Sequence, residues 1–498
     1  MRNNQIKLGA IISYLSIGFN ILAGLLYTPW MVQQIGKSNY GLYTLATSLI
    51  TLFLIDFGLS SATSRYVSKY VAEGKNDKVN VFLGAVYKLY FIIDAVIVAG
   101  LLIVYFFIDK IYVNLTPAEL DKFKVVYIIV ATFSVVNFPF VTFNGILTAY
   151  EEFISLKFAD FLNRFLTVAL MIIALLNGYG LYALVSVNAF SGLVTIAFKY
   201  IIIRKKLPAK ARFQKNDFSL YKEIFKFSFW VTITAIAQRL IFNITPSILG
   251  IVASSSAIAV FGIVTTIEQY SYMITSAING MFMPKISRIY AGTDKDKSIM
   301  PIMIKVGKFQ FGLNALIVLG FLFLGRDFID LWVGNEYASA YIGILLVIIP
   351  GAFFNSLEIA NTAMTVNKKV KYQAYIALII GIFNVICSFI LSGFYGAMGA
   401  CFSIFIAYSF RAVFYIICHQ RVMGFDMKLF IKECYLKFVP SVLITLLSGF
   451  VINVIITQSG WVWLGVKGTV IVAVFGVSFF FTSISRQSRS LLLKKIRG

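Results

Sequence analysis

The chain has 498 residues, of which 59% are hydrophobic and only 13% are charged, and its mean hydropathy is +0.85. A soluble protein of this length could not bury so much apolar surface, so the composition excludes a soluble globular protein. The net charge of +23 would suit a nucleic-acid-binding protein, but the basic residues lie between apolar blocks, in alternate connecting segments, which is typical of membrane topology.

Long apolar blocks fill most of the chain. Each block is about twenty residues long or longer, the length that crosses a bilayer as an α-helix. We therefore predict an all-α polytopic membrane protein with about fourteen transmembrane helices. In chain order we expect them near residues 8–31, 41–64, 81–108, 125–149, 156–176, 181–203, 224–252, 257–283, 302–324, 340–366, 372–391, 397–418, 438–457 and 462–484. The first block is too long for the core of a cleavable signal peptide, so we expect it to be the first spanning helix.

The connecting segments differ in charge between the two sides of the membrane. If the amino terminus lies inside, the segments on that side carry 30 of the 44 Lys and Arg, and those on the opposite side carry 5. Because Lys and Arg concentrate in cytoplasmic loops, this asymmetry predicts that both termini are cytoplasmic. Topology thus explains the charge, and we predict no nucleic-acid partner.

Motifs of the first half recur in the second half at nearly one spacing. The segment SKYVAEGKNDK from Ser68 aligns with SRIYAGTDKDK from Ser287, 219 residues later (287 − 68). Two further pairs follow in the same order, namely Thr28-Pro29 with Thr245-Pro246, and Pro-x-x-x-Phe-Asn at Pro139–Asn144 with Pro350–Asn355. Because six is an even number, a repeat of six spans keeps the orientation of each span, which predicts two lobes in parallel.

The repeat divides the chain into four predicted parts. Two pseudo-symmetric six-helix lobes occupy residues 1–203 and 224–420. A basic cytoplasmic linker, 204–223, joins them, and residues 421–498 add two transmembrane helices and a basic cytoplasmic tail.

One stretch of the first lobe resembles a known family. The sequence DFGLSSATSRYVSKYVAEGKND from Asp56, preceded by GKSNYGLYTLATSL from Gly36, resembles the amino-terminal half of bacterial polysaccharide exporters. These are the Wzx-type lipid-linked oligosaccharide flippases, polysaccharide transporters of the MOP superfamily, which also contains the MATE drug exporters and the lipid II flippases.

The resemblance implies a function and a location. The chain would move an undecaprenyl-pyrophosphate-linked oligosaccharide, such as an O-antigen, capsule or exopolysaccharide repeat unit, from the inner to the outer leaflet of the bacterial cytoplasmic (inner) membrane. It would do so by ion-coupled alternating access, with no cofactor other than a coupling ion, proton or sodium. The expected partners are the lipid-linked substrate and membrane lipids, with a polysaccharide polymerase and glycosyltransferases as further candidates.

Four cations within the spans are candidates for binding the pyrophosphate of such a substrate. An ionisable group at mid-bilayer costs ~2.5–3.5 kcal/mol on insertion scales, so each one needs an explanation. Lys88 and Lys308 lie 220 residues apart (308 − 88), so the repeat would place one in each lobe at similar depth. Arg239 lies near the middle of the seventh predicted span, and Arg164 adds a cation to the first lobe. The alternatives are that both lysines reach the cytoplasmic surface and that Arg164 neutralises Asp160, four residues before it.

Three carboxylates are candidates for ion coupling, namely Asp56, Asp94 and Glu268. A carboxyl group held away from water takes up a proton more easily, and a transport cycle can use that proton. The alternative for the two aspartates is a static salt bridge with Lys88 or Arg164. Arg411 lies closer to the cytoplasmic end of its span, and we expect its guanidinium to reach the surface.

Other function classes are weighed against the flippase. A cation-coupled exporter of small amphipathic molecules has the same architecture and stays the alternative. A membrane enzyme such as a polysaccharide polymerase needs a large loop or soluble domain with catalytic carboxylates, and the longest outside loops, near 109–124 and 325–340, are short. The four cysteines form no CxxC pair and His419 is the one histidine, so we expect no metal site and no enzyme.

Overall fold

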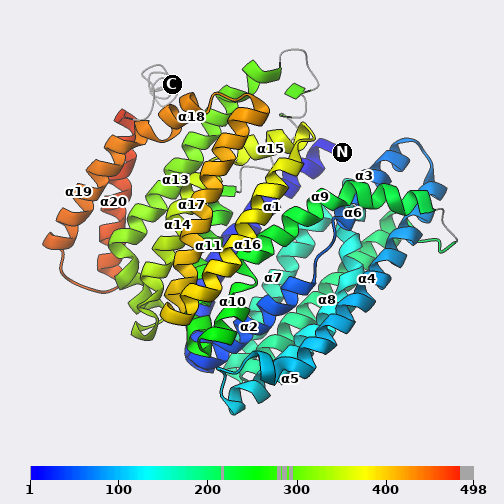
Figure 1. Cartoon of the computed structure of the whole chain (residues 1–498), viewed down its shortest axis with the longest axis horizontal. Helices are drawn as coiled ribbons and strands as arrows, with labels where there is room; N and C mark the ends of the chain where they lie inside the picture. The colour runs from blue at the N-terminus through cyan, green and yellow to red at the C-terminus, as the bar shows by residue number, and fades with distance from the viewer. Residues whose placement is uncertain are drawn as a thin grey trace. The chain divides into compact units, whose positions relative to one another are not determined.

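The computed structural model describes residues 2–214, 218–276, 282, 286, 289–290 and 295–482. In this part of the chain every regular element is a helix, which confirms the all-α class (Figure 1). Twelve helices are long and apolar enough to cross a membrane, or up to thirteen if one bent pair counts as a single span. Helices satisfy their own backbone hydrogen bonds, so apolar blocks of this length form helices in lipid.

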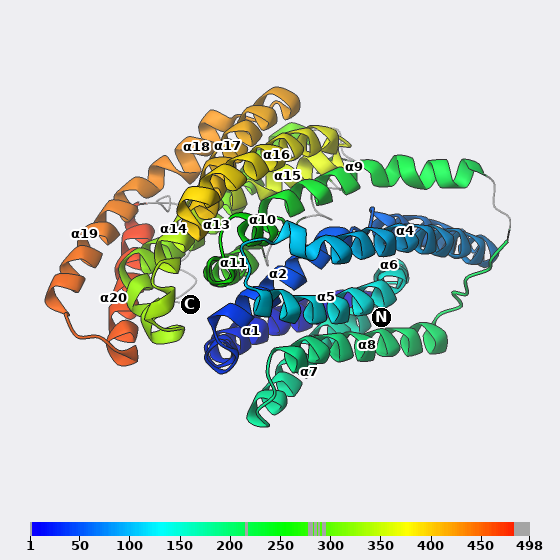
Figure 2. The ribbon, with the colours of Figure 1, turned by 60° about the horizontal axis from the view of Figure 1, so that its bottom comes forward.

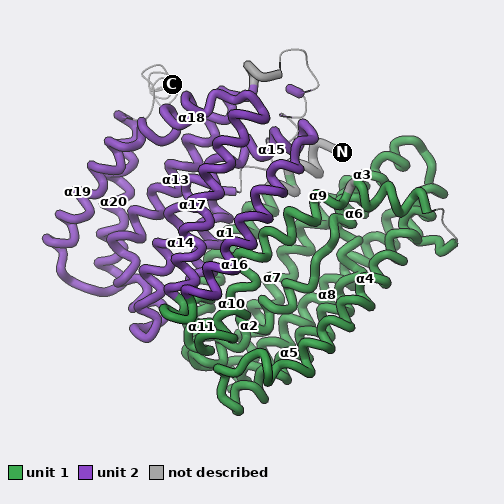
Figure 3. The backbone as a smooth tube through the Cα atoms, in the orientation of Figure 1, with its two compact units in different colours: residues 1–262, 392–397 green, residues 263–391, 398–498 purple. Residues whose placement is uncertain are grey.

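The chain divides into two compact units, coloured separately in Figure 3. Unit 1 comprises Met1–Gly262 with Ser392–Ala397, and unit 2 comprises Ile263–Leu391 with Met398–Gly498. The predicted boundaries at 203, 223 and 420 stay a prediction. The helices up to residue 262 are α1 (Arg2–Ile35), α2 (Lys37–Phe53), α3 (Leu59–Ala72), α4 (Asn76–Ile111), α5 (Pro117–Asn137), η1 (Phe138–Val141), α6 (Thr142–Ala149), α7 (Phe153–Leu176), α8 (Leu181–Lys206), α9 (Phe218–Phe242), α10 (Thr245–Val252) and the start of α11 (Ser255–Ser276).

Unit 2 takes over within α11 and continues to the end of the described chain, apart from the short piece that belongs to unit 1. Its further elements are α13 (Lys295–Trp332), η3 (Asn335–Tyr337), α14 (Ala340–Asn355), α15 (Glu358–Val366), α16 (Val370–Tyr395), α17 (Ala397–Met423), α18 (Met427–Cys434), η4 (Leu436–Phe438), α19 (Val439–Ile455) and α20 (Trp461–Thr482).

Each predicted span coincides with one or more of these helices, but two spans are broken. The second, 41–64, is interrupted between the end of α2 and the start of α3. The tenth, 340–366, consists of α14 and α15, which meet at a bend of 49°. Hydropathy does not show such breaks, because the residues at each interruption are themselves mostly apolar.

The helix bounds follow the repeat that the motifs predict. Helix α4 has 36 residues, and α13, which begins 219 residues later (295 − 76), has 38. Helix α16 begins 217 residues after α7 (370 − 153), and α17 begins 216 residues after α8 (397 − 181). The second copy of the first motif, within Ser276 to Lys297, lies largely outside the described residues.

The fourth and tenth spans end in the same backbone turn. Glu151 after α6 has φ 59° and Lys368 after α15 has φ 57°, two left-handed residues 217 positions apart (368 − 151). In each turn the following amide reaches back five residues, from Glu152 to Leu147 at 2.9 Å and from Lys369 to Met364 at 2.9 Å. These bonds satisfy carbonyl groups that a helix end leaves without a partner.

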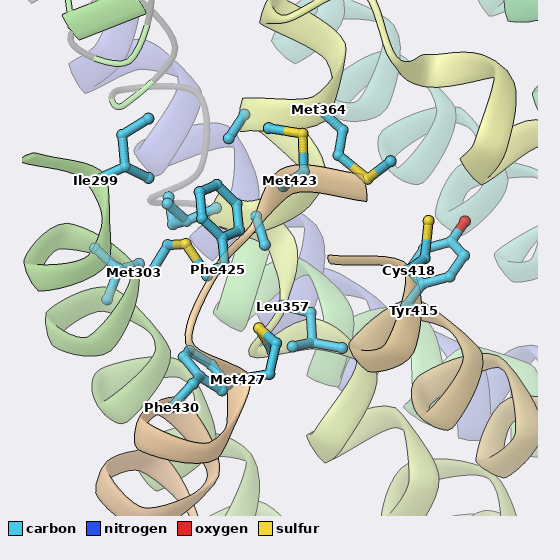
Figure 4. Close-up of a cluster of buried hydrophobic side chains, with 14 of the residues drawn as sticks. Ile299, Met303, Leu357, Met364, Tyr415, Cys418, Met423, Phe425, Met427 and Phe430 are labelled. Carbon is cyan, nitrogen blue, oxygen red and sulfur yellow. The ribbon is translucent and has the colours of Figure 1, made fainter. Parts of the chain in front are cut away.

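The helices after the repeat pack onto α13 through large apolar side chains. Phe425, Met427 and Phe430, at the start of α18, lie in one buried cluster with Met303 of α13 and Leu357 (Figure 4). Further along α13, Phe311 and Leu319 are buried together with Phe438 and Phe475 of the last helices. Burial of this kind stabilises by roughly 1.5–3 kcal/mol for each large side chain. The extra helices thus belong to the core of unit 2.

Candidate functional site

The break in the second span is a turn at Asp56–Gly58, in the stretch that carries the family resemblance. Phe57 has φ 50° and Gly58 has φ 67°, so two consecutive residues are left-handed. Glycine adopts this conformation without steric cost. A Cβ at Gly58 would lie 3.1 Å from the Cβ of Ser228, on α9, so the turn also packs closely against that helix.

Arg239 of α9 binds the carboxyl end of α2 at this break. Its Nε donates to the carbonyl oxygen of Thr51 at 2.9 Å and its Nη2 to that of Leu54 at 2.9 Å. Its Nη1 donates to the carbonyl of Ala235 on its own helix at 3.4 Å. A helix end leaves carbonyl groups unpaired and carries partial negative charge, so a cation is favourable there. This contact gives Arg239 a structural role near mid-span.

Asp56 binds the amino end of α3 on the other side of the same break. Both of its carboxylate oxygens accept from the backbone N–H of Ser60 at 3.2 Å, and the hydroxyl of Tyr90 donates to Oδ1. A carboxylate is favourable at the positive end of a helix, as at an ordinary N-cap. Arg239 interacts with Asp56 electrostatically. The expected salt bridge of Asp56 with Lys88 does not form, because Lys88 has another partner.

Lys88 of α4 reaches the segment that follows α8. Its Nζ donates to the backbone carbonyl of Gln214, in the predicted inter-lobe linker. The counterpart in unit 2, Lys308 of α13, forms an ion pair with Glu433 of α18 at 2.5 Å, and Glu433 also pairs with Lys437 at 2.5 Å. Each lysine thus binds a different kind of partner within its own unit.

Arg164 differs from the other three predicted cations in its surroundings. Asp160, which could have neutralised it, pairs instead with Lys157 and Lys199, each at 3.5 Å, so the pairing of Arg164 with Asp160 is wrong. Arg164 is exposed and interacts with Tyr43 of α2 through space. Within the described part of the chain, no hydrogen bond or ion pair holds its guanidinium.

Lys199 of α8 is a charged group that the sequence analysis missed. Its Nζ donates to Oδ1 of Asn144 on α6 at 2.9 Å, and its side chain is only 12% exposed. In unit 2, Nε2 of His419 lies 3.1 Å from Oδ1 of Asn361, and these residues follow Lys199 and Asn144 by 220 and 217 positions (419 − 199, 361 − 144). Extending the repeat alignment to Asn144 would have revealed the pair.

The other two predicted coupling groups lie on α4 and α11. Oδ1 of Asp94 is shielded from solvent and has no hydrogen-bond partner within the described residues. Glu268 lies near enough to Tyr272 and Tyr408 to interact with them electrostatically. Neither carboxylate forms an ion pair within the described chain. Both therefore remain candidates for proton uptake, whereas Asp56 has a helix end to bind.

Arg411 corrects one expectation of the sequence analysis. Its side chain does not reach the surface but is 2% exposed, inside unit 2. The guanidinium carbon lies 4.3 Å from the ring centre of Phe354 and 5.4 Å from that of Tyr415. Aromatic faces attract a cation electrostatically, and Glu358 contributes a nearby negative charge. These rings, distant in sequence, are what the position of Arg411 within its span could not reveal.

The structure groups the predicted site residues by unit. Unit 1 contains Asp56, Lys88, Asp94, Arg164 and Arg239, and it joins Asp56 with Arg239 at the helix break. Unit 2 contains Glu268 and Lys308. Their roles in substrate binding and ion coupling stay predictions. Among the described residues no group of three or more His, Cys, Asp or Glu could hold a metal ion.

The sequence and the fold both resemble those of known proteins. Residues 6–290 match the family described as polysaccharide biosynthesis protein. Over 215 residues the chain is 25% identical to the capsular polysaccharide biosynthesis protein CapF of Staphylococcus aureus, a match that covers 42% of this chain. It covers 52% of that relative, so the chain spans about half of the relative's length.

Two solved structures have a similar fold. The lipid II flippase MurJ in an inward closed conformation is 16% identical, with a TM-score of 0.75, over 94% of this chain and 99% of that one. An inward-facing MATE family multidrug resistance transporter of the MOP superfamily is 12% identical, with a TM-score of 0.70, over 84% and 99% of the two chains. Since the family match spans more than half of the 498 residues, this multi-pass membrane protein belongs to the polysaccharide biosynthesis protein family of the MOP superfamily.

Proposed function

We propose that this protein moves an undecaprenyl-pyrophosphate-linked oligosaccharide from the inner to the outer leaflet of a bacterial cytoplasmic membrane, and that it is not an enzyme. The family match supports a role in polysaccharide biosynthesis, and the fold is one that flippases and exporters use. The oligosaccharide would be an O-antigen, capsule or exopolysaccharide repeat unit. A polymerase and glycosyltransferases would act on the same lipid before and after transport.

The observation that carries the proposal is the exposed guanidinium of Arg164 on a membrane-spanning helix. A cation there is costly unless an anion compensates it, and no protein carboxylate does so among the described residues. Arginine binds phosphate oxygens with a planar, bidentate geometry. The pyrophosphate of the substrate would supply the missing negative charge during its passage.

The other predicted cations would contribute through the protein groups that they already bind. Lys308 shares Glu433 with Lys437, so this trio carries a net positive charge and can still attract an anion. Lys88 is held by a neutral carbonyl group and keeps its full charge. Arg239 would act mainly by fixing the broken second span.

Binding measurements on charge variants test the proposal. One charge pair at ~6 Å with an effective dielectric of ~20 is worth roughly 2.8 kcal/mol. Arg164→Ala should therefore weaken binding of an undecaprenyl-pyrophosphate sugar by up to about a hundredfold, and Arg164→Lys by less. The matched control is Arg326→Ala, which removes an exposed arginine near the other end of a span.

The same assay separates the two candidate functions. If Arg164→Ala binds the pyrophosphate lipid as the parent does, and an uncharged lipid-linked sugar also binds equally well, the flippase proposal fails. A coupled exporter of small amphipathic molecules, which the likeness to MATE transporters would support, then becomes the better candidate. Ion coupling by a proton or sodium is part of either proposal.

A further inference from the structure

A pocket of ≈ 350 Å³ lies in unit 1, apart from the charged groups described above. It is bordered by α4, α6, α8 and the non-helical segment 207–214 that follows α8. Aromatic side chains form much of its wall, among them Tyr87, Phe143 and Tyr200. Its basic residues are Arg204 and Lys210, and no carboxylate lines it. The volume lies within the range of ~300–1,000 Å³ that is usual for small-molecule sites.

The segment 207–214, called the strap below, is held across the start of α4. The backbone N–H of Lys210 donates to Oδ1 of Asn80 at 2.7 Å, and that of Arg212 donates to the Asn80 carbonyl at 2.9 Å. Gly84 lets the strap approach, because a Cβ there would lie only 2.0 Å from the carbonyl oxygen of Arg212. Figure 2 shows this segment leaving α8 and running past the end of α4. The pocket is therefore closed on one side by a specifically bound chain segment.

The basic groups lie at one end of the pocket, beside an aromatic ring. The guanidinium carbon of Arg204 is 5.5 Å from the ring centre of Tyr200, and its Nε donates to the Tyr200 hydroxyl at 3.1 Å. Arg204 is two residues before the end of α8, so it lies near the membrane surface, unlike Arg164 in the middle of α7. Phosphate groups of membrane phospholipids lie at that level.

We propose that this pocket binds an anionic phospholipid of the membrane. Its phosphate lies between Arg204 and Lys210, and the first carbons of one acyl chain follow the aromatic wall. The predicted linker 204–223 carries seven Lys and Arg directly after a spanning helix, a pattern that attracts anionic lipids of the cytoplasmic leaflet. The bound lipid would join the strap to α4 and α8, and thereby fix the start of the linker.

The experiment measures lipid retention by the purified full-length chain in mixed micelles, by native mass spectrometry. The probes are phosphatidylglycerol, zwitterionic phosphatidylcholine and undecaprenyl pyrophosphate. We expect one tightly held phosphatidylglycerol for each chain. The double variant Arg204→Gln with Lys210→Gln should weaken it about 25-fold, since each basic residue near the lipid contributes a factor of about five. The control, Lys205→Gln with Lys222→Gln, removes two exposed basic residues outside the pocket and should change retention less than twofold.

Three results would overturn the assignment. Equal retention of phosphatidylglycerol and phosphatidylcholine would mean that charge is not recognised. An equal loss in the control variant would reduce the effect to general attraction by the linker. Displacement of phosphatidylglycerol by an equimolar amount of undecaprenyl pyrophosphate would assign the pocket to the transported substrate. The flippase proposal is tested separately, because Arg164→Ala leaves this pocket intact.

Discussion

At the scale of single residues, Arg239 and Asp56 bind opposite helix ends at one break. Arg239 satisfies carbonyl groups of α2, and Asp56 accepts from an amide of α3, so each charge compensates a terminus that the break creates. An isolated charge at this depth would be unfavourable. The break supplies partners of the correct sign on both sides.

Removal of Arg239 should therefore affect stability before it affects substrate binding. A hydrogen bond to a charged group is worth about 1.5–3 kcal/mol, and Arg239→Ala leaves the carbonyls of Thr51 and Leu54 unpaired. We expect a loss of about 2–4 kcal/mol, seen as a lower unfolding temperature in detergent. Arg239→Lys should recover part of it. Full stability of the alanine variant would show that these bonds are not formed in the membrane.

Asp94 and Glu268 are the residues at which ion coupling is to be tested. Neither forms an ion pair within the described chain, so proton uptake would break no such contact. If either couples transport, Asp94→Asn or Glu268→Gln should retain substrate binding but lose at least tenfold of the gradient-dependent rate, measured in proteoliposomes with an imposed proton or sodium gradient. Asp109→Asn, at an exposed surface pair with Lys124, is the control. An unchanged gradient dependence in both variants would remove these residues from the coupling mechanism.

Sequence reasoning reached some charged groups and not others. It singled out Arg164 and Arg239 from their depth alone, because hydropathy marks any charge within an apolar block. It could not foresee that Arg239 binds the carbonyls of α2, since this requires a break in another helix. Lys199 was missed because it lies close to the basic end of its span, where a lysine usually reaches the surface.

At the scale of elements, hydropathy predicted the helices but not their interruptions. The prediction placed a span wherever the structure has one helix or a helix pair, and the repeat gave the correct pairing of α7 with α16 and of α8 with α17. Breaks depend on which backbone groups find partners elsewhere, as at Asp56–Gly58. A window of mean hydropathy averages over such positions.

The contact of the strap with α4 depends on one glycine. Gly84→Ala would place a Cβ 2.0 Å from the Arg212 carbonyl, so the strap must move away. We expect faster trypsin cleavage after Lys210 and Arg212 in the purified protein, by about tenfold if the displacement costs about 1.4 kcal/mol. Gly320→Ala on α13, where nothing lies within 4 Å of the new Cβ, should leave cleavage unchanged. Identical digestion of both variants would contradict the strap geometry.

At the scale of the whole molecule, the distribution of Lys and Arg predicts how the chain crosses the membrane. The excess of 30 over 5 places both termini and the linker in the cytoplasm. Cysteines in a Cys-free variant test this directly. Lys75→Cys should resist an impermeant thiol reagent in intact cells, whereas Asn335→Cys and Gln458→Cys, at exposed positions, should react. Labelling of Lys75→Cys from outside, while the other two stay unlabelled, would invert the predicted topology.

The paired turns at Glu151 and Lys368 bear on the ancestry of the molecule. The two residues have opposite charge, yet each keeps a left-handed backbone that favours glycine. A conformation shared where the side chains have diverged is best explained by inheritance from a single half-length ancestor that was duplicated. Alignments of distant homologues should therefore be anchored on this turn, because backbone geometry has outlasted residue identity between the two halves.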